Sequence, residues 1–356
     1  MPTMKHGKRR THRTHRTHRT AWLAATAAVS CVLLTAGPAA AEKGVGGGTP
    51  AATPEVSGGQ EGGSLLASAG GIVYDRSKNG SGPRTGAIAP TGTYKPPPCW
   101  YGPTYTPAEF KKEREAVWSV DSTGYEWDAK QRKKYVEGEP YKDFNMDKAG
   151  KGYWWTSFPN KSYPPGWDSC DKETFWVDKG DPPPADAPEA IDPEILAKLA
   201  LAEIRVPGTK VSLAPEATTK VNLPTWAWLD GAEFKPVSVT ASVPVLDIEA
   251  TTTAEPVSLR IDPGTPDAET YPASGVCDLT KQGIGEPYAK GKSKETPPCG
   301  VKYLRSSGKG SFPLKATVTW KIHWVGTGVN GEQALPDGEF GADQDVVVEE
   351  IQAINR

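Results

Sequence analysis

Asp143, Asn145 and Asp147 alternate along the chain as the oxygen ligands of a calcium-binding loop do. Such a loop needs Gly at its sixth position and Glu at its twelfth. This chain has Lys148 and Trp154 at those positions. The three residues are therefore a candidate calcium site on a partial match, and the alternative is an ordinary polar turn.

A second stretch matches part of a phosphate-binding loop. Gly291-Lys292-Ser293 fits the end of the P-loop motif, in which four residues separate the first Gly from Gly-Lys-Ser or Gly-Lys-Thr. The nearest upstream glycine, Gly285, leaves five residues between. Pro297-Pro298 would also block the helix that must follow a P-loop. We therefore predict a solvated loop and disfavour a nucleotide-binding function.

Residues for hydrolytic catalysis are scarce. Four of the five histidines precede residue 20, so His323 is the remaining candidate base for a Ser-His-Asp triad. We expect His323 to be a solvated residue on the polar face of a strand. Sequence spacing does not exclude a pair of carboxylates of the glycosidase type. A hydrolase of cell-wall polymer is therefore the alternative to a non-enzymatic protein.

Aromatic residues provide the best candidate binding surface. Eighteen of the 31 Phe, Trp and Tyr residues lie in the 79 residues from Cys99 to Val177, which marks this segment as a separate module. If Tyr153-Trp154-Trp155 is extended, the middle ring points away from its neighbours, so at least one ring could be exposed. Exposed rings suit sugar faces or a protein partner. Together with Trp100 and Tyr101 they form the candidate site, and the alternative is that the rings form the core of the module.

The first 41 residues are typical of a secretory signal peptide. Seven Lys and Arg residues without any acidic residue precede an apolar run over 21–36, and Ala39-Ala40-Ala41 follows. We predict a secreted protein, extracellular or associated with the cell wall. No second apolar stretch approaches the roughly 20 residues that a membrane-spanning helix requires.

The charge of the mature chain argues against nucleic acid as a partner. The whole chain has 41 basic and 43 acidic side chains, and cleavage after Ala41 would leave 34 basic ones and a formal charge of −9. A mildly acidic protein has no general attraction for polyanions. We therefore expect the partner to be an envelope protein or a cell-wall glycan.

Composition divides the rest of the chain into four segments. Residues 42–96 are rich in Gly, Pro, Ser and Thr and are predicted to be a disordered linker, although Ile72-Val73-Tyr74 would suit a docking strand. The aromatic module follows at 97–179 and a stiff Pro-rich linker at 180–191. Residues 192–356 are predicted to hold a helix and then a β-sandwich.

Local patterns predict the elements that would position these residues. Thr106-Pro107-Ala108-Glu109 is typical of a helix start with a capping box, and a second helix is expected over 127–136. Asp192-Pro193-Glu194 predicts a third helix. Alternating apolar residues at 237–243, 257–261 and 318–324 predict strands with one buried face. The fold class is therefore mainly β, with a small α+β module before the sandwich.

Four cysteines remain after the predicted cleavage. An even number of cysteines in an exported chain predicts two disulfides, and four cysteines allow three pairings. The division into modules favours Cys99–Cys170 and Cys277–Cys299, one in each module. Their spacing matches no zinc pattern.

Several motifs of the C-terminal segment indicate a family resemblance. They are Asn222-Leu223-Pro224-Thr225-Trp226-Ala227-Trp228, Asp262-Pro263-Gly264-Thr265, Cys299-Gly300-Val301-Lys302-Tyr303 and Ala316-Thr317-Val318-Thr319-Trp320. The segment resembles the immunoglobulin-like, PKD-type domains of exported actinobacterial proteins, although their turn is usually Gly-Asp-Gly-Thr. Through Cys99-Trp100-Tyr101-Gly102-Pro103-Thr104 and Gly152-Tyr153-Trp154-Trp155, the mature chain also resembles secreted streptomycete proteins. The resemblance implies an immunoglobulin-like fold and secretion, and it implies no reaction.

These patterns together predict an exported, non-enzymatic protein of the envelope or the extracellular space. It would contact a protein or a glycan through the aromatic module, which the β-sandwich would present. Sandwich domains are common scaffolds for such binding, so this step rests on analogy between folds.

Overall fold

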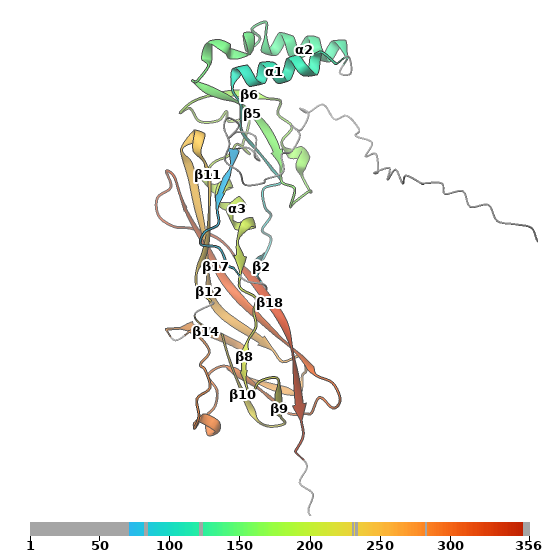
Figure 1. The fold of residues 1–356 in the computed structure, drawn as a ribbon, viewed down its shortest axis with the longest axis vertical. Coiled ribbons are helices and arrows are strands. Elements are labelled where there is room, and N and C mark those ends of the chain that lie inside the picture. Colours follow the sequence, from blue (N-terminus) through green and yellow to red (C-terminus); the bar gives the residue numbers. More distant parts are fainter. Residues whose placement is uncertain are drawn as a thin grey trace, which may run out of the picture. The chain divides into compact units, whose positions relative to one another are not determined.

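Strands dominate the protein in the computed structural model (Figure 1), which describes residues 71–81, 85–120, 124–229, 231, 234–281 and 283–351. The predicted signal peptide, residues 1–41, lies outside the described residues, as does the first part of the predicted linker. A nine-stranded, a four-stranded and a three-stranded sheet hold most of the strands. The predicted fold class, mainly β with a small α+β module, is confirmed.

The nine-stranded sheet contributes the largest share of the hydrophobic core. β14 pairs with β12 and β15 pairs with β14, so these two strands extend the sheet beside β12. The pairing of β9 with β18 is parallel, and all the other pairings of this sheet are antiparallel. The main path runs in the order β1 (Val73–Asp75), β11 (Val237–Val243), β12 (Ile248–Asp262), β17 (Phe312–Gly326), β18 (Gln333–Glu349) and β3 (Ala89–Pro90), and the further strands are β9 (Thr218–Lys220), β14 (Val276–Thr280) and β15 (Gly283–Ile284).

Alternation of apolar and polar residues decides which face of this sheet is buried. In β11 the residues at 237, 239, 241 and 243 are buried and those between them are half-buried. In β17 the residues at 318, 320, 322 and 324 are buried in the same way. The strands predicted from the alternation are confirmed, because a period of two places every second side chain on one face.

A four-stranded sheet packs against the buried face of the large sheet. Its order is β13 (Ala268–Tyr271), β16 (Gly300–Tyr303), β10 (Pro224–Trp228) and β8 (Ser212–Ala214). Tyr303 of β16 stacks on Phe312 of β17, with ring centroids 5.3 Å apart. Trp228, the last residue of β10, forms an isolated β-bridge with Gly285, the residue after β15, and this bridge connects the two sheets. Two sheets with a shared core are the arrangement that defines a β-sandwich.

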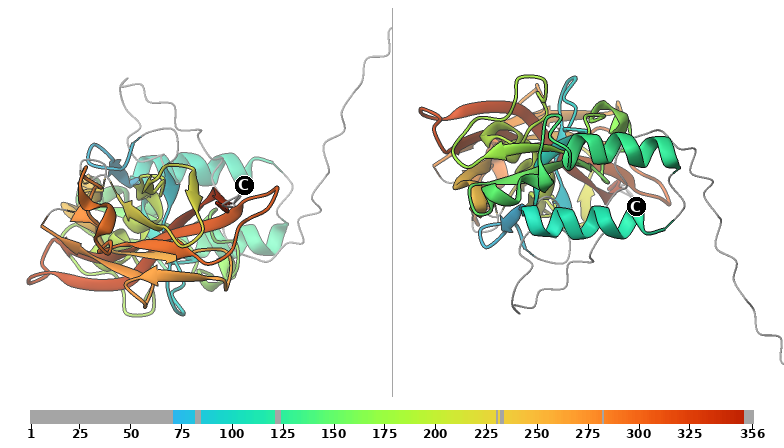
Figure 2. Two further views of the ribbon diagram at one scale, coloured as in Figure 1. Left: turned by 90° about the horizontal axis from the view of Figure 1, so that it is seen from below. Right: turned by 90° about the horizontal axis from the view of Figure 1, so that it is seen from above.

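The aromatic module contains the three-stranded sheet and two helices. The sheet runs in the order β4 (Cys99–Tyr105), β5 (Gly152–Pro159) and β6 (Phe175–Asp178). Helices α1 (Pro107–Trp118) and α2 (Tyr125–Tyr135) run alongside one another (Figure 2). The Thr106 N–H donates to the Glu109 carboxylate at 2.8 Å, and the Glu109 N–H donates to the Thr106 hydroxyl at 3.4 Å. The predicted capping box and both predicted helices are confirmed.

Helix α3 (Pro193–Glu203) lies on the buried face of the large sheet, and β7 (Arg205–Val206) follows it. Asp192 caps the helix by accepting a hydrogen bond from the Ile195 N–H at 2.7 Å, as the sequence predicts. The Thr252 hydroxyl of β12 donates to the Ala197 carbonyl at 2.8 Å, which ties the helix to the sheet. The short 3-10 helices are η2 (Asp143–Lys148), η3 (Trp167–Ser169), η4 (Pro244–Leu246) and η5 (Lys292–Lys294).

The described part of the predicted linker 42–96 is not disordered. β1 pairs with β11, β2 (Gly86–Ala87) pairs with β7, and β3 pairs with β18. Ile72 and Ile88 are buried. The composition of this segment is misleading because each strand has only two or three residues, and their pairing depends on partner strands far along the chain.

The predicted linker 180–191 is also part of the fold. Ala187, Ala190 and Ile191 are buried. The Tyr101 N–H donates to the Glu189 carbonyl at 2.9 Å, and the Ile191 N–H donates to the Tyr101 carbonyl at 2.8 Å. This segment therefore runs along β4 and connects the module to the large core.

Candidate functional site

The candidate aromatic site lies in a sheet with two buried faces. Trp154 belongs to a cluster with Phe110 of α1 and Tyr135 of α2, and it is 0% exposed. Trp155 belongs to the large core, together with Phe175, and it is 2% exposed. Adjacent rings thus point in opposite directions, as predicted for an extended strand. Both directions lead into a core, which contradicts the prediction of an exposed ring.

Trp154 is the centre of the smaller cluster. The four nearest ring centroids lie 4.5 to 5.5 Å from its own, and they belong to Phe110, Tyr141, Tyr135 and Trp176. Its indole N–H donates to the Phe144 carbonyl at 3.1 Å. Three of these contacts are edge-on, and ring contacts of this kind add to the free energy gained by burial. The ring therefore stabilises the module and cannot contact a ligand in this structure.

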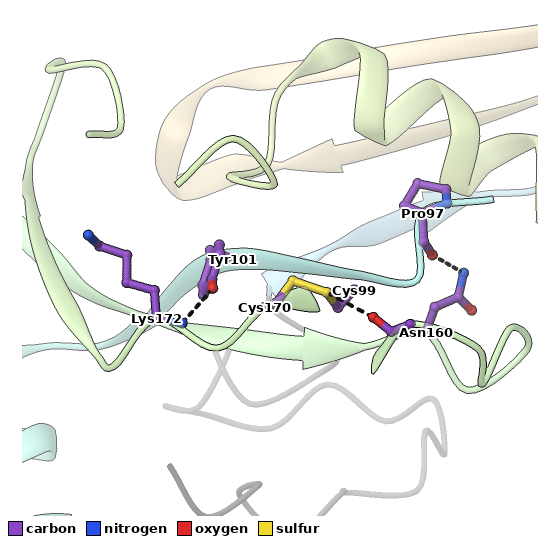
Figure 3. Close-up of a disulfide and its surroundings, with 7 residues drawn as sticks. Pro97, Cys99, Tyr101, Asn160, Cys170 and Lys172 are labelled. Atoms are coloured by element: carbon purple, nitrogen blue, oxygen red, sulfur yellow. Dashed lines mark hydrogen bonds between the residues drawn. A yellow bond between two sulfur atoms is a disulfide. The ribbon is translucent and has the colours of Figure 1, made fainter. Parts of the chain in front are cut away.

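Trp100 and Tyr101 are buried in the strand that begins at Cys99. Figure 3 shows Tyr101 near the Cys99–Cys170 disulfide. The Tyr101 hydroxyl accepts a hydrogen bond from the Lys172 backbone N–H at 2.8 Å. Burial raises the pKa of the Tyr101 phenol. Asn160 fixes the start of β4, because its side-chain amide donates to the Pro97 carbonyl at 2.7 Å.

Of the five predicted binding residues, only Tyr153 is left half-buried. The alternative, that the rings form a core, is the one the structure supports. The physical reason is coverage on both sides: α1 and α2 cover one face of the three-stranded sheet, and the rest of the protein covers the other.

Both disulfides form as predicted. Cys99 pairs with Cys170, and Cys277 pairs with Cys299, with Cα–Cα distances of 6.1 and 5.7 Å. All four residues are buried. Structural disulfides of this kind persist in oxidising compartments, so they are consistent with an extracellular protein.

The calcium candidates form a turn that serves the aromatic core. Asp143, Phe144 and Asn145 have φ angles of 39°, 54° and 55°, a left-handed run that directs Phe144 into the smaller cluster. The Asp143 carboxylate accepts from the Lys111 ammonium group at 3.3 Å, and this positive charge opposes a bound cation. Within the part of the chain that the structure describes, no group of three or more His, Cys, Asp or Glu could hold a metal ion.

The partial P-loop match lies in a loop that ends in a single 3-10 turn, η5. Gly291 at its start has a φ of 104°. The Lys292 ammonium group pairs with Glu286 and lies 5.3 Å from the centre of the Trp226 ring. The predicted surface loop is present, with the difference that Lys292 is held by a carboxylate and a ring rather than surrounded by solvent.

His323 lies on β17, on the polar side of the strand. It pairs across the sheet with Thr253 of β12 and Ala334 of β18. Its Nε2 is 3.8 Å from a carboxylate oxygen of Glu332, and its side chain is 17% exposed. The position on a polar face is as predicted, but neighbouring side chains cover most of the ring.

The same polar face holds a row of hydroxyl groups that the sequence alone does not reveal. Thr240 of β11 pairs with Thr251 of β12, and their hydroxyl oxygens are 2.7 Å apart. Ser238 pairs with Thr253, which pairs in turn with His323. The period-two pattern shows that these residues face away from the core, but only the strand register shows that they adjoin.

Comparisons of the chain with protein-family models, with curated proteins and with solved structures found no match. Among the described residues, no helix is both long enough and apolar enough to cross a membrane.

Proposed function

We propose that this is an exported, non-enzymatic protein that acts as a binding or structural component of the cell envelope or the extracellular space. The observation that carries the proposal is the pair of buried disulfides. Disulfides of this kind persist outside the reducing cytoplasm. The signal-like first 41 residues and the resemblance to PKD-type domains support the same location.

In this proposal the aromatic module is a structural unit, and the contact surface is the polar face of the large sheet. Ser238, Thr240, Thr251 and Thr253 place hydroxyls on adjacent strands, next to His323. A hydroxyl group both donates and accepts hydrogen bonds. A hydroxyl-rich polymer such as a cell-wall glycan fits this surface better than an apolar partner does.

Fractionation of the producing cells tests the location. We expect the protein outside the cytoplasm, with all four cysteines oxidised. Recovery from the cytoplasm with free thiols would contradict the proposal at its first step.

Co-sedimentation with purified insoluble cell wall tests the surface. We expect the mature chain to be retained and Thr251→Val/Thr253→Val to lose retention, because Val keeps the shape and removes the hydroxyls. Thr218→Val/Thr296→Val is the matched control, since both residues are exposed and lie outside this row of hydroxyls. Equal retention of all three proteins would refute the assigned surface. Release of soluble sugar into the supernatant would instead favour the alternative, a hydrolase with paired carboxylates.

A further inference from the structure

One short segment pairs with both edges of the main path of the large sheet. We call residues 71–81 and 85–91 the strap. Its strand β1 lies at one end of the path, on β11, and its strand β3 lies at the other end, on β18. Between them β2 pairs with β7. Figure 1 shows the strap in blue, and its first strand, β1, lies beside β11.

The middle of the strap is clamped at the end of α3. The Asn79 side-chain amide donates to the Glu203 carbonyl at 2.8 Å, and its side-chain oxygen accepts from the Arg205 N–H at 2.7 Å. The Gly80 N–H donates to the Arg205 carbonyl at 2.9 Å. The Arg76 guanidinium group pairs with the Glu203 carboxylate at 2.8 Å. The strap thereby satisfies backbone groups that a helix end leaves unpaired.

Close approaches at glycines show that the strap fits the surface beneath it. A Cβ added to Gly80 would lie 2.2 Å from the Arg205 carbonyl oxygen, a backbone atom that cannot easily move. A Cβ on Gly86 would lie 2.0 Å from the Phe340 ring, and one on Gly338 would lie 2.0 Å from Ile88. A segment that merely lay over the sheet would leave room for these atoms.

The strap covers backbone groups that would otherwise be open to pairing. On β11 these belong to residues 240–242, and on β18 they belong to Gly338 and Glu339. The Ser238 N–H also donates to the Lys78 carbonyl, and the Thr91 N–H donates to the Asp337 carbonyl. An uncovered sheet edge is a template for a strand of another chain.

We propose that the strap is an edge cover that prevents the large sheet from pairing with a second copy of this chain. Displacement of the strap leaves β11 as a seven-residue edge strand with a regular alternation of apolar and polar residues. Two such edges pair antiparallel about a two-fold axis, which is the simplest symmetric contact between copies. The partner of the uncovered edge is therefore the same edge of a second copy.

The test compares Gly80→Ala with the matched control Gly310→Ala in the full mature chain. The nearest atom to a Cβ on Gly310 is 3.8 Å away, an ordinary van der Waals distance, so this substitution meets no clash. Size-exclusion chromatography with light scattering measures the mass over a range of concentrations, and hydrogen exchange measures protection of β11. We expect Gly80→Ala to form dimers at concentrations at which the unmodified chain and the control are monomers.

Hydrogen exchange and a peptide provide the second readout. In dilute Gly80→Ala, the amides of Thr240 and Ser242 should exchange at least about tenfold faster than in the control, which corresponds to roughly 1.4 kcal/mol of local opening. A synthetic peptide of residues 71–91 should return the dimer to monomer. Faster exchange without any rise in mass, or dimers that saturating peptide leaves intact, would overturn the proposal. If Gly80→Ala does not fold, Arg76→Ala/Asn79→Ala removes the clamp without a clash and is held to the same outcomes.

Discussion

Replacement of Trp154 by Ala distinguishes a structural ring from a ligand-binding ring. The side chain is 0% exposed, four rings surround it, and its N–H is bonded to the Phe144 carbonyl. Truncation of a buried Trp costs about 3–5 kcal/mol through lost burial and a residual cavity. The orphaned carbonyl adds about 1 kcal/mol. We expect a loss near the upper end of this range, about 5 kcal/mol.

Such a loss is comparable to the whole stability of many domains, which is about 5–15 kcal/mol. Guanidinium unfolding followed by tryptophan fluorescence measures it. Tyr125→Ala is the control in the same module, because that ring is 89% exposed and its removal should change stability by less than about 0.5 kcal/mol. A folded Trp154→Ala protein that lost under about 1 kcal/mol would refute the assignment of this ring to a core.

Three further perturbations have definite expected outcomes in the same unfolding assay. Thr106→Ala removes the capping box of α1 and should cost about 1 kcal/mol, with Thr296→Ala as an exposed control. Cys277→Ala/Cys299→Ala opens a loop with a sequence separation of 22 residues and should cost about 3 kcal/mol; an unchanged midpoint would contradict it. Hydrogen bonds from the Trp176 indole and from Lys148 lower the pKa of the Asp178 carboxyl. The ionised Asp178 carboxylate therefore stabilises the folded state above the unfolded pKa of about 4, and this stabilisation is lost as pH falls below that value. Asp178→Asn should accordingly flatten the dependence of the unfolding free energy on pH between about pH 5 and pH 3.

Features encoded by neighbouring residues could be predicted from the sequence. The capping box at Thr106 and the Asp192 cap each involve residues three apart, so no knowledge of the fold is needed to recognise them. The alternation in β11 and β17 reflects one buried face, because every second residue of each strand is apolar and buried. The disulfide pairing followed from the division into modules.

Features that depend on distant contacts could not be predicted in this way. The burial of Trp154 and Trp155 on opposite faces requires α1 and α2 on one side and the large core on the other. The sequence Tyr153-Trp154-Trp155 alone does not indicate that both faces of the sheet are covered. The strap has strands too short to show a period, and each pairs with a partner more than 100 residues away.

The three-stranded sheet contributes side chains to both hydrophobic clusters, so the aromatic module and the sandwich should not unfold independently. Tyr101, Trp155 and Phe175 complete the large core, and removal of the sandwich would expose them to water. Calorimetry of the intact chain should then show one endotherm whose van't Hoff and calorimetric enthalpies agree. A fragment cut within 180–191 would lose the strand-like pairing along β4 and carry an apolar face into solution. The linker 180–191 that composition predicts therefore does not separate two units that unfold independently.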